Sequence, residues 1–292
     1  MGFYTPSQLV QDARRHGVEV RPVDVMHSAV ESTLEDMPDT PAVRLGLHMV
    51  HGLQATSAAR IVAERAVAPF ARADELARRA RLEQHEMKLL AAAGALATLS
   101  GHRRQQVWAA AALHAPPELL QAAPVDEAFL ELPAAPEGEE VVWDFASVGL
   151  TLRSHPMALL RPQLERYRAR TSAQLQHVRD GRWVRTVGMV TLRQQPPTAK
   201  GTVFVSLEDE HGSTQIIVWR HVKEAQRQAL LGARLLLVQG RWQREGAVCN
   251  LIAHRLWDLS SLLGRLATQS RDFHCSNGIW RQLRIVFRCA YR

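Results

Sequence analysis

The chain has few cysteines and almost no lysine, and it lacks the sequence signatures of several enzyme classes. Cys249, Cys275 and Cys289 are odd in number and have no metal-ligand spacing, so we predict neither a disulfide framework nor a zinc site and expect a cytoplasmic location. No Gly-x-x-x-x-Gly-Lys phosphate loop and no Gly-x-Ser-x-Gly nucleophile motif occurs. The apolar runs fall short of the ~20 residues of a membrane span, and no signal peptide is recognisable, so no membrane partner is expected.

The chain also has no Asp-x-Asp pair of the kind that holds Mg²⁺ in two-metal phosphoryl transfer. Its one acidic trio, Glu208 to Glu210, falls in a predicted hairpin turn, where a solvated turn is more ordinary than a metal site. His155 stands next to Pro156 with no second ligand at helical spacing, which favours a turn before a helix. We therefore predict no catalytic residue, no metal site and no cofactor in this chain.

Positive charge is in modest excess. The formal net charge is +7, and residues 275–292 supply four of these charges as arginines without any acid. Overall basicity is therefore only weak support for a nucleic-acid partner. Only three of the 36 basic residues are lysines, which suits bidentate arginine contacts with phosphate but is equally expected of a GC-rich genome.

One segment predicts a function more directly. Leu45 to Leu53 followed by Ala58 to Val62 has the pattern of two short helices joined at a glycine, a helix-hairpin-helix. Gly52 can adopt a positive φ and bring main-chain amides close to a phosphate, while the next helix, capped by Thr56 or Ser57, directs its N-terminal N–H groups at the same oxygen. Such contacts hold DNA without reading its sequence, although an ordinary helical hairpin gives the same pattern. The side chains expected to pack the two helices together are Leu47, Val50, Leu53, Ile61 and Val62.

The residues around this motif fall into two regions, 1–40 and 41–112. Thr5 to Gln8 predicts a capped helix that stops at Gly17, and Val18 to Val23 predicts a short strand. One helix and one strand cannot bury a core alone. Residues 41–112 are expected to be helical, and Leu99 to Trp108 is a second hairpin candidate, for which core packing is the more ordinary interpretation.

Residues 113–180 are expected to be a linker with connecting helices. Proline, alanine and glutamate dominate residues 113–142, which predicts a boundary or a flexible connection. Residues 143–180 resume a folded pattern that leads into a basic helix.

The pattern changes to strands at Trp183. Strands are predicted at 184–192, 202–208, 214–219, 233–239 and 248–257, with one helix at 221–230 after the third strand. This is the order of a five-stranded OB barrel, a fold that binds single-stranded nucleic acid in a basic groove with aromatic stacking platforms. The predicted fold class is therefore α+β and multidomain: a helical region with tandem helix-hairpin-helix motifs, an OB-fold barrel over 181–260 and a C-terminal tail over 261–292.

Aromatic and basic side chains of the barrel are the candidates for its nucleic-acid groove, although the aromatic ones can equally fill the barrel interior. The candidates are Trp183, Arg185, Arg193, Lys200, Phe204, Trp219, Arg241, Trp242 and Arg244.

Several segments together resemble the C-terminal part of a bacterial C-family DNA polymerase III α-like subunit, in particular its error-prone, damage-inducible branch. The similarity spans nearly all of residues 2–274. The segments that carry it are Gly2 to Pro22, Gly46 to Arg65, Ala92 to Leu96, Gly149 to Leu160 and Thr198 to Asp209.

This resemblance implies that residues 1–40 are the end of the fingers region, that 41–112 grip duplex DNA and that the barrel lies near single-stranded template. The PHP and palm regions, which hold the catalytic aspartates, would precede Met1, so this chain is expected to be inactive alone. The intact enzyme would extend DNA with Mg²⁺, copy past lesions in damage-induced mutagenesis and work with translesion accessory proteins and a sliding clamp. The DNA contacts expected in the hairpin are His51, Gly52, Leu53, Thr56 and Arg60.

Two expectations concern the ends of the chain. Met1 is expected to be an internal methionine of the polymerase. Residues 275–292 lie outside the resemblance and are expected to be a non-native extension through a lost stop codon or a frameshift, with a basic membrane- or nucleic-acid-binding tail as the alternative. Two other functions stay open. The chain could be a stand-alone DNA-binding accessory protein, or its barrel could bind RNA like the barrels on tRNA synthetases.

Overall fold

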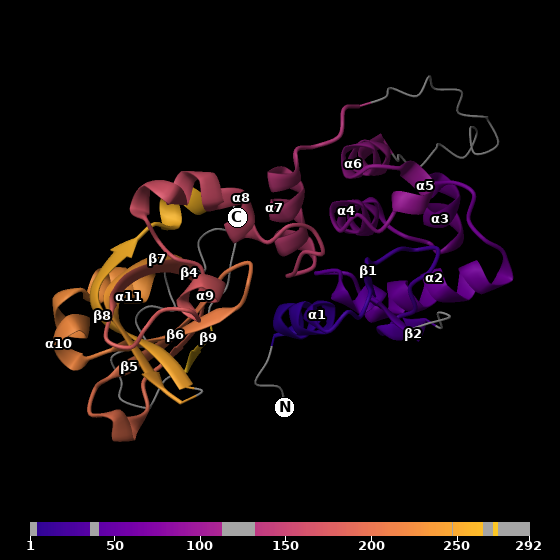
Figure 1. The fold of residues 1–292 in the computed structure, drawn as a ribbon. Coiled ribbons are helices and arrows are strands. Elements are labelled where there is room, and N and C mark those ends of the chain that lie inside the picture. The colour runs from indigo at the N-terminus through magenta and orange to yellow at the C-terminus, as the bar shows by residue number, and fades with distance from the viewer. Residues whose placement is uncertain (1–4, 36–40, 113–131, 247, 265–270, 274–292) are drawn as a thin grey trace. The chain divides into compact units, whose positions relative to one another are not determined.

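The computed structural model describes residues 5–35, 41–112, 132–246 and 248–264, together with the backbone of residues 271–273. The chain divides into two compact units, Met1–Ser154 and His155–Arg292 (Figure 1). Within the described residues, no helix has both the length and the apolar character that a membrane crossing needs. Cys275, Cys289 and the predicted extension at 275–292 lie outside the described residues.

The first unit is mainly helical, and its first helix starts as predicted. Thr5 Oγ1 accepts a hydrogen bond from Gln8 N at 3.2 Å, Gln8 Oε1 accepts one from Thr5 N at 2.9 Å, and Pro6 occupies the first helical position. The helices of this unit are α1 (Pro6–Arg15), α2 (Ala55–Val67), α3 (Ala73–Arg79), α4 (Gln84–Ala92), α5 (Ala97–Ser100), α6 (Arg103–Ala112) and α7 (Glu137–Ser147), with the 3-10 turn η1 (Leu47–Met49) before α2.

A small sheet lies between α1 and α2 in the sequence, and it corrects two predictions. The strand predicted at 18–23 is shorter, β1 (Val20–Arg21), and β3 (Ala42–Arg44) occupies the start of the region predicted to be helical. β3 lies in the middle of the sheet, parallel to β1 and antiparallel to β2 (Thr33–Glu35). Local periodicity missed β2 and β3 because each has only three residues, which is too short to show an alternating pattern.

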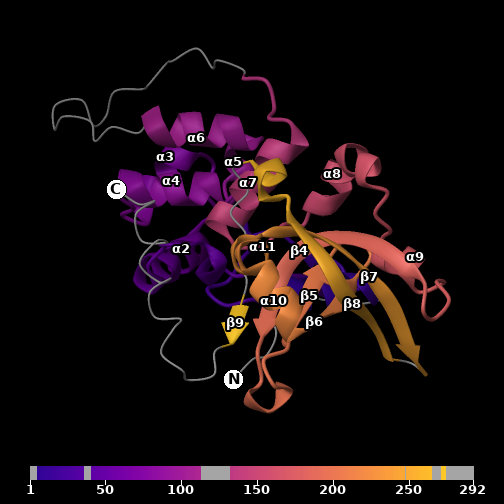
Figure 2. The ribbon, with the colours of Figure 1, turned by 90° about the vertical axis from the view of Figure 1, so that its left-hand side faces the viewer.

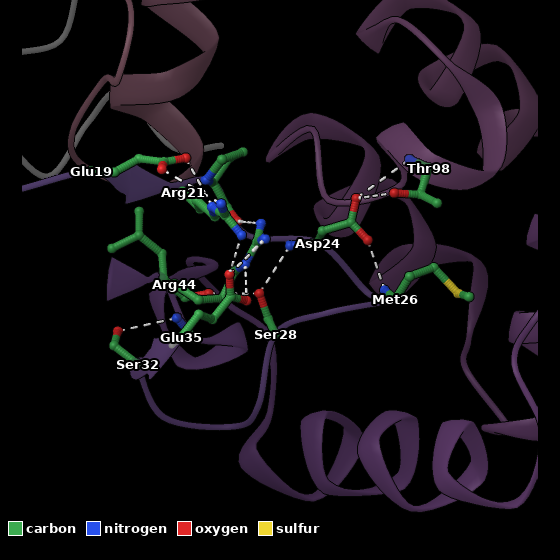
Figure 3. Close-up of polar contacts among 12 residues, drawn as sticks. Glu19, Arg21, Asp24, Met26, Ser28, Ser32, Glu35, Arg44 and Thr98 are labelled. Atoms are coloured by element: carbon green, nitrogen blue, oxygen red, sulfur yellow. Dashed lines mark hydrogen bonds and ion pairs between the residues drawn. The ribbon is translucent and has the colours of Figure 1, made fainter. Parts of the chain in front are cut away.

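One carboxylate joins all three strands of this sheet (Figure 3). Glu35 Oε1 accepts a hydrogen bond from Arg44 Nε at 2.8 Å, and Glu35 Oε2 accepts one from Arg21 Nη1 at 2.7 Å. Arg44 is buried and also donates to the carbonyl oxygen of Pro22 at 3.1 Å. Nearby, the buried Asp24 accepts hydrogen bonds from the amide of Met26 and from the hydroxyl of Thr98 on α5, each at 2.7 Å (Figure 3). The sheet is therefore held by charge-assisted hydrogen bonds as well as by its short ladders.

The first unit has one hydrophobic core, to which the small sheet and the helices both contribute. Val23 and Val25 are buried in the same cluster as Leu47, Ile61 and Leu90. This agrees with the expectation that the first 40 residues cannot bury a core alone. The packing predicted for the hairpin is confirmed. Leu47, Val50 and Ile61 are buried, and Leu53 and Val62 pack against them half-buried.

The predicted linker ends earlier than expected, because residues 137–142 form the first half of α7. A buried ion cluster fixes this helix to α6. Arg103 Nη1 lies 3.0 Å from a carboxylate oxygen of Glu140, and Arg103 Nη2 lies 2.5 Å from one of Asp144. Arg153 adds a further contact of 2.8 Å to Glu140. The composition of 113–142 does not predict the start of this helix, because the arginine that pairs with its acidic residues lies on α6, outside that segment.

The second hairpin candidate serves core packing. Gly101 turns the chain between α5 and α6 with a φ of +70°. The buried Gln106 on α6 donates to the Gly101 carbonyl at 2.6 Å and accepts from Leu96 N at 3.1 Å. Arg103 is also buried, so these polar side chains at the start of α6 are used inside the unit and do not face a ligand.

The second unit contains the predicted barrel, with its strands and helices in the predicted order. Its barrel strands are β4 (Trp183–Gln194), β5 (Val203–Glu208), β6 (Ser213–Val218), β7 (Leu235–Glu245) and β8 (Val248–Asp258). Its helices are α8 (Pro156–Leu164), α9 (Ser172–Leu175), α10 (Arg220–Ala225) and α11 (Arg227–Gly232), and its 3-10 turns are η3 (Glu165–Tyr167), η4 (Pro197–Ala199) and η5 (Ser260–Leu263).

β4 closes the barrel because it is long enough to pair twice. Its first half pairs antiparallel with β7 over residues 183–189, and its second half pairs antiparallel with β5 over residues 189–194. The circuit is completed by the antiparallel β5–β6 and β7–β8 pairs and the parallel β6–β8 pair. A short additional strand, β9 (Arg271–Phe273), lies parallel to the end of β4, inside the region predicted as a tail.

The single helix predicted between the third and fourth strands is two helices. Gln226 separates α10 from α11 with a non-helical φ of −129° and ψ of 36°. Both helices pack against β8 (Figure 2). The Gln226 side chain explains the break, since its Oε1 accepts from Leu256 N at 2.8 Å and its Nε2 donates to the carbonyl oxygen of His254 at 3.0 Å. This anchoring to a distant strand has no local sequence signal.

We predict that Gly240→Ala destabilises the barrel. A Cβ at Gly240 would overlap the carbonyl oxygen of Ile252 and lie 2.8 Å from its carbonyl carbon, and these backbone atoms cannot move without disturbing the β7–β8 pair. We expect the free energy of unfolding to fall by about 1–3 kcal/mol in urea denaturation. Gly232→Ala is the matched control, because nothing lies within 4 Å of the Cβ position there. An equal loss in both variants would contradict this explanation.

We also predict that Glu35 stabilises the first unit only while its carboxylate is ionised. Hydrogen bonds from Arg44 and, less strongly, from Arg21 lower the pKa of Glu35 from its ordinary value of 4.5, against the opposing effect of burial. Since the folded-state pKa lies below the unfolded one, the stabilisation is complete above about pH 4.5 and is lost as the pH falls through the folded-state pKa. Glu35→Gln should lower the free energy of unfolding at pH 7 and make it less dependent on pH at the acid end.

The control for this prediction is Glu224→Gln. Glu224 pairs with Arg220 on an exposed helix surface, so its removal should change stability much less. Unfolding midpoints of the three proteins, measured from pH 3 to pH 7, decide the matter. Identical pH profiles for the wild type and Glu35→Gln would show that the sheet does not depend on this carboxylate.

Candidate nucleic-acid interface

The predicted hairpin is present, although its first helix is only the 3-10 turn η1. The chain turns at His51 and Gly52, and α2 begins at Ala55. Gly52 has the predicted positive φ, +83°. A Cβ at this position would lie 3.3 Å from Leu89 Cδ1 on α4, so a side chain would be both conformationally strained and crowded. The turn therefore depends on glycine for two independent reasons.

The predicted N-cap of α2 is wrong. Gln54 is the N-cap, with a φ of −74° and a ψ of 144°, and its side chain makes no capping hydrogen bond. Thr56 and Ser57 lie inside the first turn of the helix. Ser57 Oγ donates to the carboxylate of Glu86 on α4 instead. Residue type misled the prediction because the turn at Gly52, and not a capping side chain, determines where α2 begins.

The start of α2 presents unpaired main-chain donors. Within the part of the chain that the structure describes, the amides of Gly52, Gln54, Ala55 and Thr56 donate no hydrogen bond. All four residues are exposed. The aligned peptide dipoles of α2 place partial positive charge at this same end. The arrangement can therefore receive an anionic oxygen without any basic side chain.

His51 is fixed beside these amides by the end of α7. Its own amide donates to the carbonyl oxygen of Ser147 at 2.8 Å, so this amide is already in use. Its ring Nδ1 lies 3.1 Å from the carbonyl oxygen of Ala146. Because a carbonyl only accepts, Nδ1 carries the hydrogen, and Nε2 of the neutral ring is an acceptor. The ring lies against Gly149, where a Cβ would be 3.3 Å from Nε2.

The structure separates the predicted DNA contacts of the hairpin. His51, Gly52 and Thr56 are exposed around the start of α2, whereas Leu53 packs half-buried against the core. Arg60 makes hydrogen bonds within the unit. Its Nε donates to the carbonyl oxygen of Ala80 at 2.8 Å, and its Nη2 donates to Ser57 Oγ at 3.0 Å. Arg60 thus ties α2 to the segment between α3 and α4.

Two of the barrel candidates are not on its surface. Trp242 is 3% exposed and belongs to the core of the barrel. Arg193 is 7% exposed, and its guanidinium donates to the carbonyl oxygens of Leu230 and Ala233 at the end of α11. The prediction that these side chains line a groove is therefore wrong. Their roles depend on which face of each strand points inward, and that could not be assigned without the register.

Five of the seven remaining barrel candidates lie in two places. Trp183, Arg185 and Arg241 are exposed on the neighbouring strands β4 and β7, where Trp183 is opposite Arg241. Lys200 and Trp219 instead line an open pocket of about 470 Å³ beside η4. Its other lining residues are Thr198, Ala199, Thr202, Arg220 and His221. Phe204 is half-buried on β5, and Arg244 is exposed near the β7–β8 turn, where it donates to the Gln176 carbonyl oxygen.

The acidic trio is neither a solvated turn nor a metal site. Glu208 Oε1 lies 3.2 Å from Nε2 of His155, and Glu210 accepts two hydrogen bonds from Arg161, at 2.9 and 2.6 Å. Asp209 is buried and accepts from the amide and the hydroxyl of Ser172 at 2.6 Å each. The prediction of a solvated turn is wrong because all three carboxylates hold the segment before β4 against the β5–β6 hairpin. The described residues contain no cluster of three potential metal ligands.

His155 confirms the prediction of a turn before a helix. It is the N-cap of α8, and its Nδ1 accepts from Met157 N at 3.1 Å.

Three residues that lie next to the candidates on β4 and β7 were not predicted from the sequence. They are His254, Arg255 and Trp257, all on β8. The β7–β8 register shifts between Gln239 and Gly240, so His254 and Arg255 are both exposed although they are consecutive. Two consecutive polar residues interrupt the apolar–polar alternation of a strand, and this is the available sequence signal for such a bulge.

Comparison with known proteins agrees with the hairpin and with the predicted resemblance. A family model described as "Helix-hairpin-helix motif" matches residues 17–106. A protein of Ralstonia nicotianae named "Error-prone DNA polymerase" is 52% identical over 282 residues, which cover 94% of this chain and 26% of that protein. Proteins of the same name from Azoarcus sp. and Xanthomonas campestris pv. campestris are 52% and 49% identical, with the same coverage. The chain spans about a quarter of the length of these curated relatives.

Solved structures show only weak similarity. Asparaginyl-tRNA synthetase from Pyrococcus horikoshii has 21% identity and a TM-score of 0.24, over 27% of this chain and 20% of that one. The Schizosaccharomyces pombe Stn1–Ten1 complex has 15% identity and a TM-score of 0.23, over 27% of this chain and 58% of that one. TM-scores this low support no statement about ligands or activity.

Proposed function

This chain is homologous to a part, 26% by length, of the bacterial proteins named error-prone DNA polymerase, and from this premise we propose that it is a DNA-binding part of such a polymerase. The helical unit holds the backbone of duplex DNA at the start of α2. The barrel holds single-stranded template. The predicted resemblance to this family is confirmed by the relatives, whereas the role of the chain within a polymerase is our proposal.

The observation that supports this function is the set of unpaired amides at the start of α2. Gly52, Gln54, Ala55 and Thr56 present N–H groups at the positive end of a helix of 13 residues. A phosphate oxygen can accept two or more of these bonds at once, and each is strengthened by the phosphate charge. Because every nucleotide carries the same phosphate, this grip is independent of sequence, as a polymerase that moves along its template requires.

The exposed aromatic and basic side chains of the barrel support the single-strand part of the proposal. Trp183 is 59% exposed, and a large aromatic side chain at the surface offers a face on which an unpaired base can stack. Duplex DNA offers no such faces along its length, since its bases are already stacked on one another.

The remaining functions of a polymerase are proposed for the longer protein. The chain has no Asp-x-Asp pair, so we infer that nucleotide addition and its Mg²⁺ ions belong to regions outside this chain. The same family inference extends to copying past lesions, and so to a role in DNA repair and damage-induced mutagenesis. It also extends to the sliding clamp and the accessory proteins as partners. We place the protein in the cytoplasm, because this is the compartment that contains the DNA of a bacterium.

We predict that Gly52→Ala weakens binding of duplex DNA by about tenfold or more. The substitution is strained at a φ of +83° and meets Leu89, so the turn must change and the amides lose their alignment. Gly17→Ala is the matched control, since Gly17 has a φ of +80° in the same unit and nothing lies within 4 Å of its Cβ position. Fluorescence anisotropy with a labelled duplex measures both affinities.

Two outcomes would count against the phosphate grip. One is equal affinity for Gly52→Ala and Gly17→Ala when circular dichroism shows both to be folded. The other is wild-type affinity that does not change with salt, because each phosphate contact should reduce log K by about 0.9 per unit of log salt concentration.

A further inference from the structure

We propose that the barrel binds single-stranded nucleic acid on the outer face formed by β4, β7 and β8, and not at the pocket beside η4. This inference rests on the proposed single-strand role of the barrel and assigns that role to one surface. We call this surface the arginine–aromatic face. It consists of Trp183, Arg185, Arg241, His254, Arg255 and Trp257.

Strand register places these residues on one side of the sheet. Trp183 is opposite Arg241, and Arg185 is opposite Gln239, which is in turn opposite Arg255. The residues that alternate with them, such as Val184 and Trp242, are buried in the barrel core. The arginine–aromatic face is therefore the outer surface, and its side chains come from three adjacent strands.

The aromatic rings of this face are held in place but remain accessible. Trp183 and His254 meet edge to face, with ring centroids 5.3 Å apart and ring planes at 85°. Trp183 nevertheless keeps 59% of its surface exposed. Trp257 is half-buried, and the Arg185 guanidinium lies 5.8 Å from its ring centroid. A ring that is already oriented loses little conformational freedom when a base stacks on it.

Within the part of the chain that the structure describes, the three arginines of this face, Arg185, Arg241 and Arg255, have no carboxylate partner. Arg185 donates one hydrogen bond to Gln239 and Arg241 donates one to the Gly181 carbonyl oxygen, which leaves most of their N–H groups available. Both acceptors, the Gln239 side chain and the Gly181 carbonyl, are uncharged, so no described residue compensates these positive charges. A polyanion is therefore the ligand that this face fits.

The pocket beside η4 is less suited to a polyanion. Arg220 in its lining is paired with Glu224 at 2.8 Å. Lys223, which follows this lining, donates to Gln195 at 2.7 Å. Trp219 is exposed there, but no aromatic ring contact involving it is found among the described residues. The pocket thus offers fewer uncompensated charges and a single ring that no other aromatic residue orients.

The spacing of the rings favours a single strand over an acidic protein. Trp183 is level with Arg241, and Trp257 is level with Leu237, four residues earlier on β7, which is roughly 13 Å along the strand. Arg185 and Arg255, both level with Gln239, lie between these two rings, and Arg241 lies beside Trp183. Bases that stack at both ends would place the connecting phosphates over the guanidinium groups. An acidic peptide would use the charges but would have no need of the rings.

The test uses the full chain and a short fluorescent oligothymidylate. Trp183→Ala should weaken its binding roughly 5- to 100-fold, the loss expected for one base stack, and should leave duplex binding unchanged. Trp219→Ala is the matched control and should change neither affinity by more than about twofold. Arg241→Ala, and separately Arg255→Ala, should reduce the slope of log K against log salt by about one each.

Three results would overturn the assignment. They are unchanged oligothymidylate binding in Trp183→Ala, a loss in Trp219→Ala that equals or exceeds it, and displacement of the oligonucleotide by polyglutamate at equal charge concentration. If the wild type does not bind oligothymidylate at all, the single-strand part of the proposed function fails too. If the wild type binds but Trp183→Ala binds equally well, only the choice of this face fails.

Discussion

The positive φ of Gly52 is the constraint on which the candidate interface depends. A chain that continued in a right-handed conformation would carry the next residues into a longer first helix, and their amides would pair inside it. At +83° the chain reverses instead, and α2 begins with its donors facing solvent. Unpaired main-chain donors are tolerated because they are exposed to water, which a phosphate can replace. The local backbone geometry thus creates the anion site.

The surrounding side chains hold this geometry before any ligand arrives. Arg60 fastens α2 to the carbonyl oxygen of Ala80, and Ser57 fastens it to Glu86. On the other side of the turn, His51 is bonded to the last carbonyls of α7 through both its amide and its ring. α7 is itself fixed by the buried cluster around Arg103. A site assembled in advance binds with a smaller loss of conformational entropy than one that must be ordered by its ligand.

Features encoded in a few consecutive residues could be predicted from the sequence. The capping box at Thr5, the turn at Gly52 and the strand order of the barrel all depend on local residue type or on hydrophobic periodicity. Features that depend on distant partners could not. From local sequence, Glu208 to Glu210 resemble solvated turn residues, and only the fold shows that they contact residues of α8 and α9. Likewise, Arg193 resembles a surface residue unless the strand register, which points it at α11, is known. The same limit hid the β8 part of the arginine–aromatic face, because a bulge at His254 interrupts the alternation of inward and outward side chains.

The most direct test of the hairpin claim is amide nuclear magnetic resonance of the deuterated chain during titration with duplex DNA. The amide signals of Gly52, Ala55 and Thr56 should shift with added duplex and return when the salt concentration is raised. The His51 amide, which stays bonded to Ser147, should shift less than these three. Unshifted signals at Gly52, Ala55 and Thr56 at saturating DNA, with shifts elsewhere in the chain, would contradict the proposed phosphate contact.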